Sequence, residues 1–477
     1  MAQLRGVPVR ARHNLRIIDA PRAVESTGRA PVLPDLAGNI DSRLLGALFI
    51  AACVAYFGVY SLEAPIRYVL YNAGKDSLIL LRDGLIVGPI ALLIAAQALR
   101  LRLHPVVFVF GMLIVFHGLV LMGTVGSATG AAYGVKILIN LLFGFFVAGL
   151  LLQPGNKVLT FLALIWCIMI VGVCLDKFVV TFPWTGIKTV VGDLNVDVSK
   201  DWQIEDPLSR RVAGFTRSSI SVAAFFPPLT IVLLSRVRHW LIRVFLVAVA
   251  LGVVALTTQK GSLFAIAPIG AVLCLPPSYR LKLLRLGCVA FVVIAIGLPF
   301  LVMSLHMAHG TGVFSTESVY LRIAYTWPQA WQWITHHSMF LFGVGLGGIG
   351  GPQRVYAPDD FNPADNVFIL MYAYFGVFAI IYLAIILYLA LRPVTGSQDR
   401  AVTATAILAF IFGYGAVLSI VEDQSGALFL GAALGVLWRE TIPVRVPPRW
   451  APIVEGGSAG VRVRPVAAAT PAAGRIQ

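Results

Sequence analysis

Charged residues are scarce in this sequence. Lysine, arginine, aspartate and glutamate account for 12% of the 477 residues, whereas hydrophobic residues account for 58%. Soluble domains carry about 25% charged residues. A soluble chain of this length would fold into several domains, each with a polar surface that so few charges would not cover. We therefore expect lipid to be the main solvent of the chain.

Cysteine is also scarce, and no secretion signal is recognisable. The five cysteines all lie inside apolar runs, which favours buried thiols over a disulfide framework. The first 42 residues are polar and contain six arginines, without the apolar core that a signal peptide needs. We expect residues 1–42 and residues 441–477 to form disordered cytoplasmic tails.

Long apolar runs fill the space between these tails. A helix needs about 20 apolar residues to cross the hydrocarbon core. Twelve candidates lie near 44–61, 77–98, 104–123, 132–152, 157–175, 214–234, 240–257, 260–276, 283–303, 367–391, 402–420 and 424–438. The sequence therefore predicts an all-α polytopic membrane protein of about twelve transmembrane helices, with its transmembrane domain at residues 43–440.

The distribution of charge predicts the orientation of these helices. With the N-terminus in the cytoplasm, most of the 37 lysines and arginines fall in the tails and the short cytoplasmic loops, whereas most of the 22 acids fall elsewhere. This is the positive-inside rule. The net charge of +15 then follows from topology and needs no nucleic-acid partner. We predict a multi-pass protein of a bacterial inner membrane, with both termini in the cytoplasm.

Two of the predicted periplasmic loops are long. They span about residues 176–213 and 304–366, whereas most predicted cytoplasmic loops have only a few residues. Long loops in a compact protein are usually functional. Within the second loop, Pro328 suits the first turn of a helix, and residues 317–337 can form a helix that lies on the membrane.

Several cations near helix ends on the predicted periplasmic face contradict the topology rule. They are Arg210, Arg211, Arg217, Lys260 and Arg322. An anionic ligand, most simply a lipid-linked phosphate or pyrophosphate, would explain them, because guanidinium binds phosphate through two hydrogen bonds and ammonium binds it as a point charge. The alternative is that they snorkel to the interface or pair with acids of the first long loop.

Other polar and aromatic residues have two interpretations each. Asp365, just before the tenth apolar run, is either a helix N-cap, the commoner role, or a general base. Trp327 and Trp331 can stack on sugars, although tryptophan is expected at any membrane interface. Arg82 and Asp83 suggest a neutralising intramembrane pair, although ionisable residues there are functional candidates by default.

Two further groups carry no predicted chemistry. The histidines at 306, 309, 336 and 337 lack a third ligand, so we expect no metal site. Glu422 and Asp423 lie at a predicted outer turn, and their residue types alone suggest no role.

The order of several short motifs is distinctive. The motifs are RVAGF at 211–215, TQKG at 258–261, Arg322 in the long loop, FGVGLG at 342–347, and Asp365-Asn366 before YFGV at 374–377. This order resembles that of the O-antigen ligase and Wzy-type polysaccharide polymerase superfamily, over roughly residues 205–440.

The resemblance implies both a fold and an activity. The fold would be GT-C-like. The activity would be a metal-independent glycosyl transfer in the periplasm that needs no cofactor and polymerises undecaprenyl-pyrophosphate-linked repeat units into exopolysaccharide or O-antigen. Partners would be the lipid-linked oligosaccharide, the lipid bilayer, a flippase and a chain-length regulator.

The resemblance also implies site residues. Arg211, Lys260 and Arg322 match family positions that bind or position the pyrophosphate, and Arg217 lies beside them in sequence. Lys260 replaces the usual arginine and loses its bidentate fork. Asp365 replaces the usual histidine of a His-Asn pair, and this departure counts most against a ligase.

The site predicted from the sequence therefore has three parts. Asp365 and Arg322 would be catalytic. Arg211, Lys260, Arg322 and Arg217 would bind pyrophosphate. Trp327, Trp331 and Asn366 would contact the glycan.

Two alternative functions remain open at this point. A ligase would pass the finished glycan to lipid A core or to a protein. A transporter of polysaccharide or lipid-linked glycan belongs to another class and would place ionisable residues near the membrane midplane, where the sequence offers little beyond Arg82 and Asp83.

Overall fold

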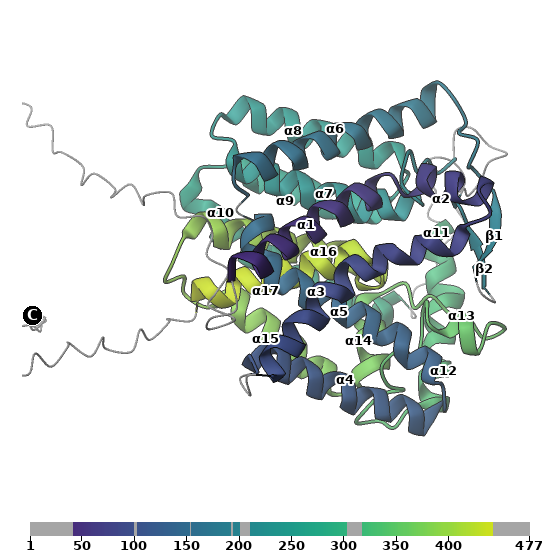
Figure 1. Cartoon of the computed structure of the whole chain (residues 1–477). Helices are drawn as coiled ribbons and strands as arrows, with labels where there is room; N and C mark the ends of the chain where they lie inside the picture. Colours follow the sequence, from purple (N-terminus) through teal and green to yellow (C-terminus); the bar gives the residue numbers. More distant parts are fainter. Residues whose placement is uncertain are drawn as a thin grey trace, which may run out of the picture. The chain divides into compact units, whose positions relative to one another are not determined.

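Figure 1 shows the computed structural model of the chain, which describes residues 42–99, 103–152, 154–191, 194–200, 210–302 and 317–441. Structural statements below refer to these residues. The predicted tails lie outside these residues, except for Ser42, which begins α1, and Thr441, which ends α17. Residues 201–209 and 303–316, at the two long loops, also lie outside them.

The described residues are mostly helical, and every predicted apolar run contains a helix, although the run at 214–234 becomes helical only at Ser219 and the run at 402–420 leaves its α-helix after Gly415. The long helices are α1 (Ser42–Ser61), α3 (Leu81–Ala98), α4 (Pro105–Thr124), α5 (Ala128–Leu152), α6 (Asn156–Phe178), α7 (Ser219–Arg236), α8 (Trp240–Leu256), α9 (Lys260–Cys274), α10 (Pro277–Val302), α14 (Val367–Phe375), α15 (Phe378–Leu391), α16 (Gln398–Gly415) and α17 (Gln424–Thr441). The run at 367–391 forms two helices, α14 and α15, because the chain turns at Gly376, which has a φ of +57°.

Seven helical segments among the described residues are long and apolar enough to cross a membrane. They are Leu44–Ser61, Asp76–Ala98, Pro105–Thr124, Ala128–Leu152, Asn156–Phe178, Ser219–Arg236 and Pro277–Leu301. Helices α8, α9 and α15 are apolar but shorter. The chain is a mainly helical, polytopic membrane protein, and the count of twelve crossings stays a prediction.

The shorter elements gather at one end of the helical bundle, on the right of Figure 1. We call it the loop end. The elements are α2 (Glu63–Asn72), η1 (Asp76–Leu80), β1 (Lys188–Val191), β2 (Leu194–Asp197), α11 (Glu317–Leu321), the π-helical η2 (Arg322–Thr326), α12 (Trp327–His337), α13 (Gln353–Tyr356) and η3 (Ile420–Glu422). Strands β1 and β2 pair antiparallel, with Lys188 opposite Asp197. The helix predicted at 317–337 is confirmed as the continuous run α11, η2 and α12.

Helices α5 and α17 approach each other so closely that their backbones touch. A Cβ atom added at Gly431 would lie 1.8 Å from the Leu141 carbonyl oxygen, and one added at Gly144 would lie 1.9 Å from that of Leu428. Glycine allows this approach because it has no side chain, as in other membrane helix pairs. The C-terminal helix is therefore seated against the middle of the chain.

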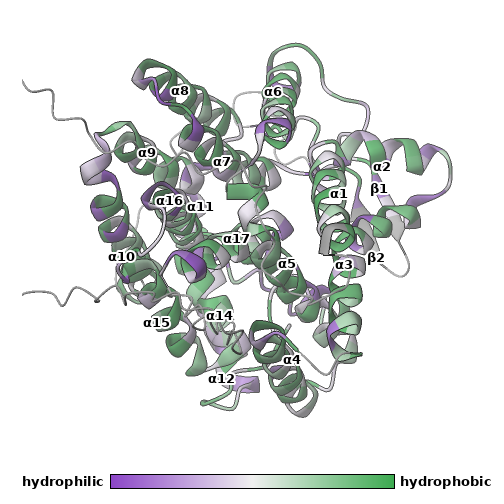
Figure 2. Ribbon diagram, turned by 60° about the vertical axis from the view of Figure 1, so that its left-hand side comes forward, coloured by the Kyte–Doolittle hydropathy of each residue, from purple (hydrophilic) through white to green (hydrophobic). Residues whose placement is uncertain are grey.

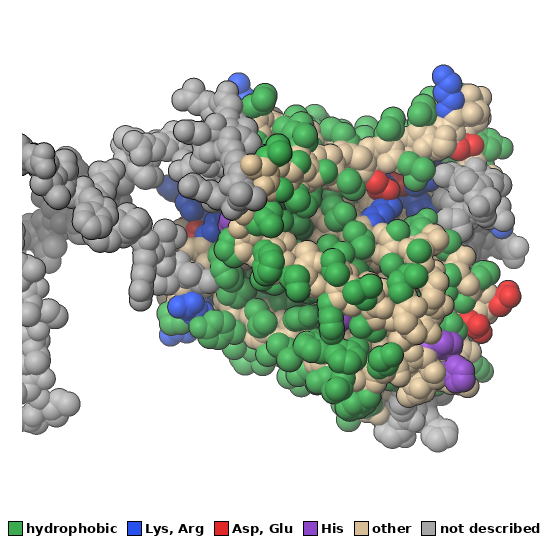
Figure 3. Space-filling view, turned by 60° about the horizontal axis from the view of Figure 1, so that its bottom comes forward, with side chains coloured by type: hydrophobic (Ala, Val, Ile, Leu, Met, Phe, Trp, Pro, Cys, Tyr) green, Lys and Arg blue, Asp and Glu red, His purple; other side chains and the backbone are tan. Residues whose placement is uncertain are grey.

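Burial differs sharply from one helix to another. The span at Ser219–Arg236 in α7 is 83% buried, whereas the span at Pro105–Thr124 in α4 is only 17% buried. Large apolar side chains such as Leu119 and Phe245 are mostly exposed. Figure 2 shows that the helices are apolar along most of their length, and Figure 3 shows an outer face covered by apolar side chains. Such a surface is suited to lipid.

The glycine-rich segment at 343–351 approaches the bundle through its backbone. The Val344 N–H donates to the Ala373 carbonyl at 2.7 Å, and the Leu346 N–H donates to the His117 carbonyl at 2.9 Å. A Cβ atom at Gly347 would come within 2.2 Å of the Gly130 carbonyl oxygen. This close backbone approach brings the residues that follow the segment onto the loop end.

Candidate functional site

Arg322 and Asp365 form an ion pair at the loop end. Arg322 Nε lies 3.1 Å from Asp365 Oδ2, and the two side chains are 18% and 20% exposed. Arg322 Nη1 also donates to the Ser318 carbonyl oxygen at 2.9 Å and to the Ser318 hydroxyl. Arg322 is thereby held in place from its own helix, while one edge of the pair stays open.

A strained turn presents Asp365 to Arg322. Ala364 and Asp365 have φ angles of +59° and +43°, a region that residues other than glycine seldom occupy. Asn362 stabilises this turn: its amide donates to the Thr326 carbonyl at 2.8 Å, and its side-chain oxygen accepts from the Ala364 N–H at 2.8 Å. The turn is thus tied to the end of η2, the segment that carries Arg322.

The N-cap of α14 is Asn366, so the cap role predicted for Asp365 is wrong. The Asn366 side-chain oxygen accepts from the Phe368 and Ile369 N–H groups at 2.8 and 3.1 Å. Its amide donates to the carbonyls of Ala295 and Ala416, both at 2.9 Å. All of its hydrogen-bonding groups are used inside the protein. The contact of Asn366 with a glycan stays a prediction.

Arg211 and Lys260 complete a group around the ion pair. Arg211 interacts electrostatically with Arg322 and Asp365, and Lys260 interacts with Arg211. We call Arg211, Lys260, Arg322 and Asp365 the Arg322 cluster. Four residues predicted from separate motifs are therefore brought together at one place.

Burial and like charge oppose ionisation in this cluster. The pKa of Arg211 is lowered by burial and then by the neighbouring Arg322. The pKa of Asp365 is raised by burial, although Arg322 and Arg211 partly oppose this. An anion bound here would relieve the repulsion between the cations.

Two groups that the sequence analysis did not select adjoin this cluster. Tyr414, on α16, interacts electrostatically with Arg322 and Asp365, and its hydroxyl donates to Gln259 Oε1 at 3.2 Å. Glu422, in η3, accepts the Gly351 N–H at 2.8 Å. Burial raises the pKa of Glu422 to about 8, and Asp365 adds to this effect. Neither residue could be recognised from the sequence as part of a site, because Tyr414 lies in an apolar helix and Glu422 lies in a short turn.

The segment at 211–215 is not helical, although the apolar run predicted at 214–234 begins within it. It forms a turn around Asp176 near the end of α6. Asp176 Oδ2 accepts the N–H groups of Ala213 and Gly214 at 3.0 and 2.9 Å, and Oδ1 accepts from Arg210 Nη2 at 2.7 Å. Helix α7 begins only at Ser219. Arg210 is thus occupied in a structural ion pair.

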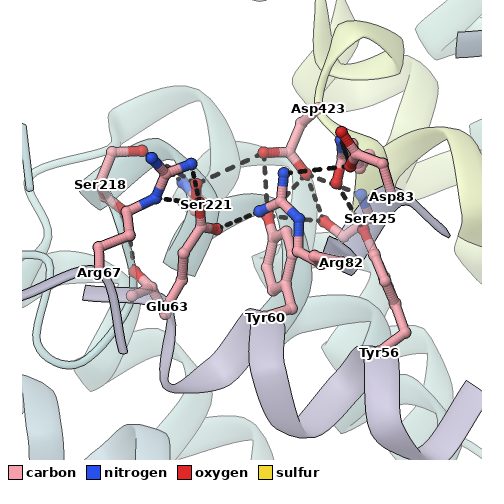
Figure 4. Close-up of polar contacts among 12 residues, drawn as sticks. Tyr56, Tyr60, Glu63, Arg67, Arg82, Asp83, Ser218, Ser221, Asp423 and Ser425 are labelled. Atoms are coloured by element: carbon pink, nitrogen blue, oxygen red, sulfur yellow. Dashed lines mark hydrogen bonds and ion pairs between the residues drawn. The ribbon is translucent and has the colours of Figure 1, made fainter. Parts of the chain in front are cut away.

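Arg217 lies in a different charged group from Arg211. Its electrostatic neighbours are Glu63, Arg67 and Arg82. Figure 4 shows Glu63 between Arg67 and Arg82. Arg67 Nη2 and Arg82 Nη1 lie 2.7 and 2.5 Å from the Glu63 carboxylate oxygens. Burial raises the pKa of Glu63, but Arg82 and Arg67 outweigh it and bring the pKa to about 2.

Arg82 and Asp83 each have a closer partner than one another. Their own ion pair measures 3.5 Å, whereas Asp83 Oδ2 lies 2.6 Å from Lys136 Nζ. The interpretation of Arg82 and Asp83 as a simple neutralising pair therefore needs correction, because Glu63 and Lys136 take the larger part. We call the whole group the Glu63 cluster. It consists of Glu63, Arg67, Arg82, Asp83, Lys136 and Arg217.

Hydrogen bonds tie the Glu63 cluster to the start of the last helix. Gln424 Nε2 donates to Asp83 Oδ1 at 2.9 Å. The neighbouring Asp423 accepts from the Tyr60 hydroxyl, with its two oxygens at 2.7 and 2.9 Å (Figure 4). Since Tyr414 interacts electrostatically with Asp423, Arg322 and Asp365, Asp423 lies between the two clusters.

The two tryptophans predicted to stack on sugars differ in exposure. Trp327 is fully buried, and its indole N–H donates to the Asp365 carbonyl at 3.4 Å. Trp327 thus supports the turn at Asp365, and its stacking on a sugar stays a prediction. Trp331 is half-buried, with the rings of Phe300 and Tyr372 centred 5.4 and 5.5 Å from its own. Its place in a glycan site stays a prediction.

Among the described residues, no three side chains of histidine, cysteine, aspartate or glutamate gather as metal ligands would. The chain matches no family model, no curated protein and no solved structure.

Proposed function

We propose that the chain is a membrane glycosyltransferase that joins lipid-pyrophosphate-linked repeat units into exopolysaccharide or O-antigen. The observation that carries the proposal is the convergence of Arg322 and Arg211 on Asp365 at the loop end, with Lys260 next to Arg211. Three cations beside one acid are suited to an anion that carries more than one charge. The order of the motifs, described above, supplies the class of substrate.

The proposed reaction replaces a sugar–phosphate bond by a glycosidic bond. The acceptor hydroxyl oxygen attacks the anomeric carbon of the donor sugar, and the bond from that carbon to the pyrophosphate oxygen breaks. The departing pyrophosphate takes the electron pair, and Arg211, Lys260 and Arg322 stabilise its charge. The hydroxyl proton passes to the Asp365 carboxylate, whose raised pKa suits a general base.

In this proposal, the ion pair with Arg322 also links substrate binding to the activity of Asp365 as a base. An incoming pyrophosphate competes with Asp365 for Arg322, because both are anions that bind guanidinium. Once Arg322 turns to the pyrophosphate, the carboxylate is free to take a proton. Substrate binding thus prepares the base in the same step that places the leaving group.

The proposed site would face the periplasm of a bacterial inner membrane. This orientation is supported by the positive-inside rule, because the short loops predicted to be cytoplasmic are rich in arginine and lysine. Lipid-linked repeat units reach that side only after crossing the membrane, so a flippase would act before this protein and a chain-length regulator beside it.

The test compares Arg322→Gln with Arg238→Gln in a deletion strain. Arg238 is an exposed arginine between α7 and α8, outside the Arg322 cluster. We expect Arg322→Gln to lower polymer formation by about 10²-fold at an unchanged membrane level, and Arg238→Gln to leave it at the wild-type level. The glycan profile is the readout.

The stranded intermediate separates the alternatives. Single repeat units on the lipid carrier, in both the deletion and Arg322→Gln, support a polymerase. Long chains left on the carrier would show a ligase, and repeat units held on the cytoplasmic leaflet would show a transporter. Normal polymer length in Arg322→Gln would refute the assignment of the site.

A further inference from the structure

The Glu63 cluster carries more positive than negative charge. Arg67 and Arg82 share the carboxylate of Glu63, and Lys136 pairs with Asp83. Arg217 makes no ion pair with any described residue and interacts with Glu63 and Asp197 only at longer range. The four cations of the cluster therefore have only two carboxylates as ion-pair partners. Buried charge of one sign is costly unless a counter-ion is bound.

Two buried donors of this cluster also lack a hydrogen-bond partner. They are the Nε atoms of Arg217 and Arg82, for which no acceptor is found within the described part of the chain. Buried polar groups without partners are rare in native structures and call for an explanation. A guanidinium that is buried, uncompensated and short of an acceptor is suited to bind an anion such as phosphate.

The surroundings of Arg217 add positive charge. The pKa of Lys200 is lowered to about 8 by burial, and then by the neighbouring Arg354 and Arg217. The pKa of Arg217 is itself lowered by burial, and Arg67 and Arg82 add to this although Glu63 and Asp197 oppose it. With Lys200, Arg217 therefore has three cations and two acids among its electrostatic neighbours.

The cluster also reaches the flank of the bundle. The side chains of Asp83 and Lys136 are partly exposed, and both lie on helices that span the membrane. Figure 3 shows acidic and basic side chains together within an otherwise apolar face. A ligand with an anionic headgroup and a lipid tail that stays in the bilayer needs polar side chains of the protein at the flank of the bundle.

We propose that the Glu63 cluster is a second anion site, and that it holds the pyrophosphate of the acceptor, a second lipid-linked glycan. This inference rests on the proposed function, because a polymerase joins two lipid-linked molecules and only the donor loses its pyrophosphate. The two clusters differ in the way that these roles require. Glu63 and Asp83 already neutralise half of the positive charge at the second site. The second site can therefore bind a pyrophosphate, but it stabilises the negative charge of a departing pyrophosphate less than the Arg322 cluster does.

The first test counts anion sites in the full chain, purified in lipid nanodiscs, by titration with inorganic pyrophosphate. We expect two sites in the wild type, one in Arg217→Gln, one in Arg322→Gln, and two in the Arg238→Gln control. Arg217→Lys keeps the charge and should keep both sites, which separates loss of binding from loss of folding. One site in the wild type, or two in Arg217→Gln, would overturn the inference.

The second test asks which substrate the site recognises. The wild type, given a lipid-linked donor, should extend a lipid-pyrophosphate acceptor at least tenfold faster than the same glycan without pyrophosphate. Arg217→Gln should lose this preference and match the wild type on the free glycan, whereas Arg322→Gln should fail with both acceptors. Equal losses on both acceptors in Arg217→Gln would refute the acceptor role. No transfer by the wild type would refute the proposed function, while two binding sites would still support a second anion site.

Discussion

The two charged clusters at the loop end are built in opposite ways. In the Arg322 cluster, a single carboxylate meets one guanidinium at 3.1 Å, and both side chains are about one-fifth exposed. In the Glu63 cluster, one carboxylate that is only 3% exposed holds two guanidiniums at 2.7 and 2.5 Å. The first group is loosely paired and open, whereas the second is tightly paired around its acid.

The difference shows that charged clusters serve two purposes in this protein, one to hold elements of the fold together and one to stay available for a ligand. Glu63 joins α2 to the start of α3 through Arg67 and Arg82, so its cluster is part of what fixes these elements. Asp365 joins only the turn before α14 to η2, and the turn has other supports in Asn362 and Asn366. A ligand can therefore separate Arg322 from Asp365 without unfolding the site.

The largest expected effect on stability comes from Glu63→Gln. This change leaves Arg67 and Arg82 buried without their carboxylate, and we expect a loss of about 3 kcal/mol or more in the free energy of unfolding. Denaturant titration in mixed micelles measures it. The matched control is Glu317→Gln, since Glu317 is exposed on α11. If both variants were equally stable, the contrast between the clusters would be lost.

The next effect in size is that of Asn366→Ala. It removes the N-cap of α14 together with two hydrogen bonds to other helices, and we expect a cost of about 2 kcal/mol. The same unfolding assay applies. Asn156→Ala serves as control, because Asn156 is exposed at the start of α6. A cost near zero for Asn366→Ala would mean that the cap is dispensable.

Breaking the Arg322–Asp365 pair should cost far less stability. For Arg322→Gln, Asp365→Asn and the double variant, we expect losses under about 1 kcal/mol each, because both side chains are partly exposed. A double-mutant cycle on the unfolding free energies gives the coupling between the two residues. Glycosyl transfer should nevertheless fall strongly in every one of them. A stability loss as large as that of Glu63→Gln would make this pair structural too.

A further expected effect is a change in pH dependence through Glu422. Its pKa in the folded protein is about 8, above its ordinary value of 4.5. Between these values the folded state holds a proton that the unfolded chain has released, so stability falls as pH rises through this window. Glu422→Gln should flatten that fall, by less than the limit of about 1.4 kcal/mol per pH unit for one proton.

Unfolding of Glu422→Gln and of the wild type at pH 5, 6.5 and 8 measures this difference. The exposed Asp359 provides the control Asp359→Asn, which should keep the wild-type slope. Parallel curves for Glu422→Gln and the wild type would show that Glu422 is ionised throughout this range.

The helices could be predicted because lipid imposes long apolar runs, and these stand out in any sequence. The helices that pack against one another could not be predicted, since a helix face toward lipid is as apolar as a face toward another helix. The small residues Gly431 and Gly435 are a signal for the contact of α17 with α5, but glycine is also common in helices that make no such contact. A Cβ atom at Gly252 in α8, for example, would meet nothing within 4 Å.

The candidate site was predictable where charge contradicted topology. Arg211, Lys260 and Arg322 stood out as cations on the unexpected side. Arg217 was grouped with Arg211 because the two are near in sequence, but the turn at Gly214 leads the chain to other neighbours.

The remaining errors arose where a residue type fits two roles. Aspartate and asparagine are equally good N-caps, so the sequence does not say which of Asp365 and Asn366 has that position. Glu422 was missed because an acid in a short turn usually faces water.

The close seating of α17 against α5 sets the order in which this protein can mature. Asp423 and Gln424, at the start of α17, are the partners of Tyr60 in α1 and Asp83 in α3, which are synthesised 363 and 341 residues earlier. Until α17 is made, these polar groups of α1 and α3 lack the partners that it supplies. A chain that stopped before α17 would also leave Gly144 of α5 without the helix that packs against it.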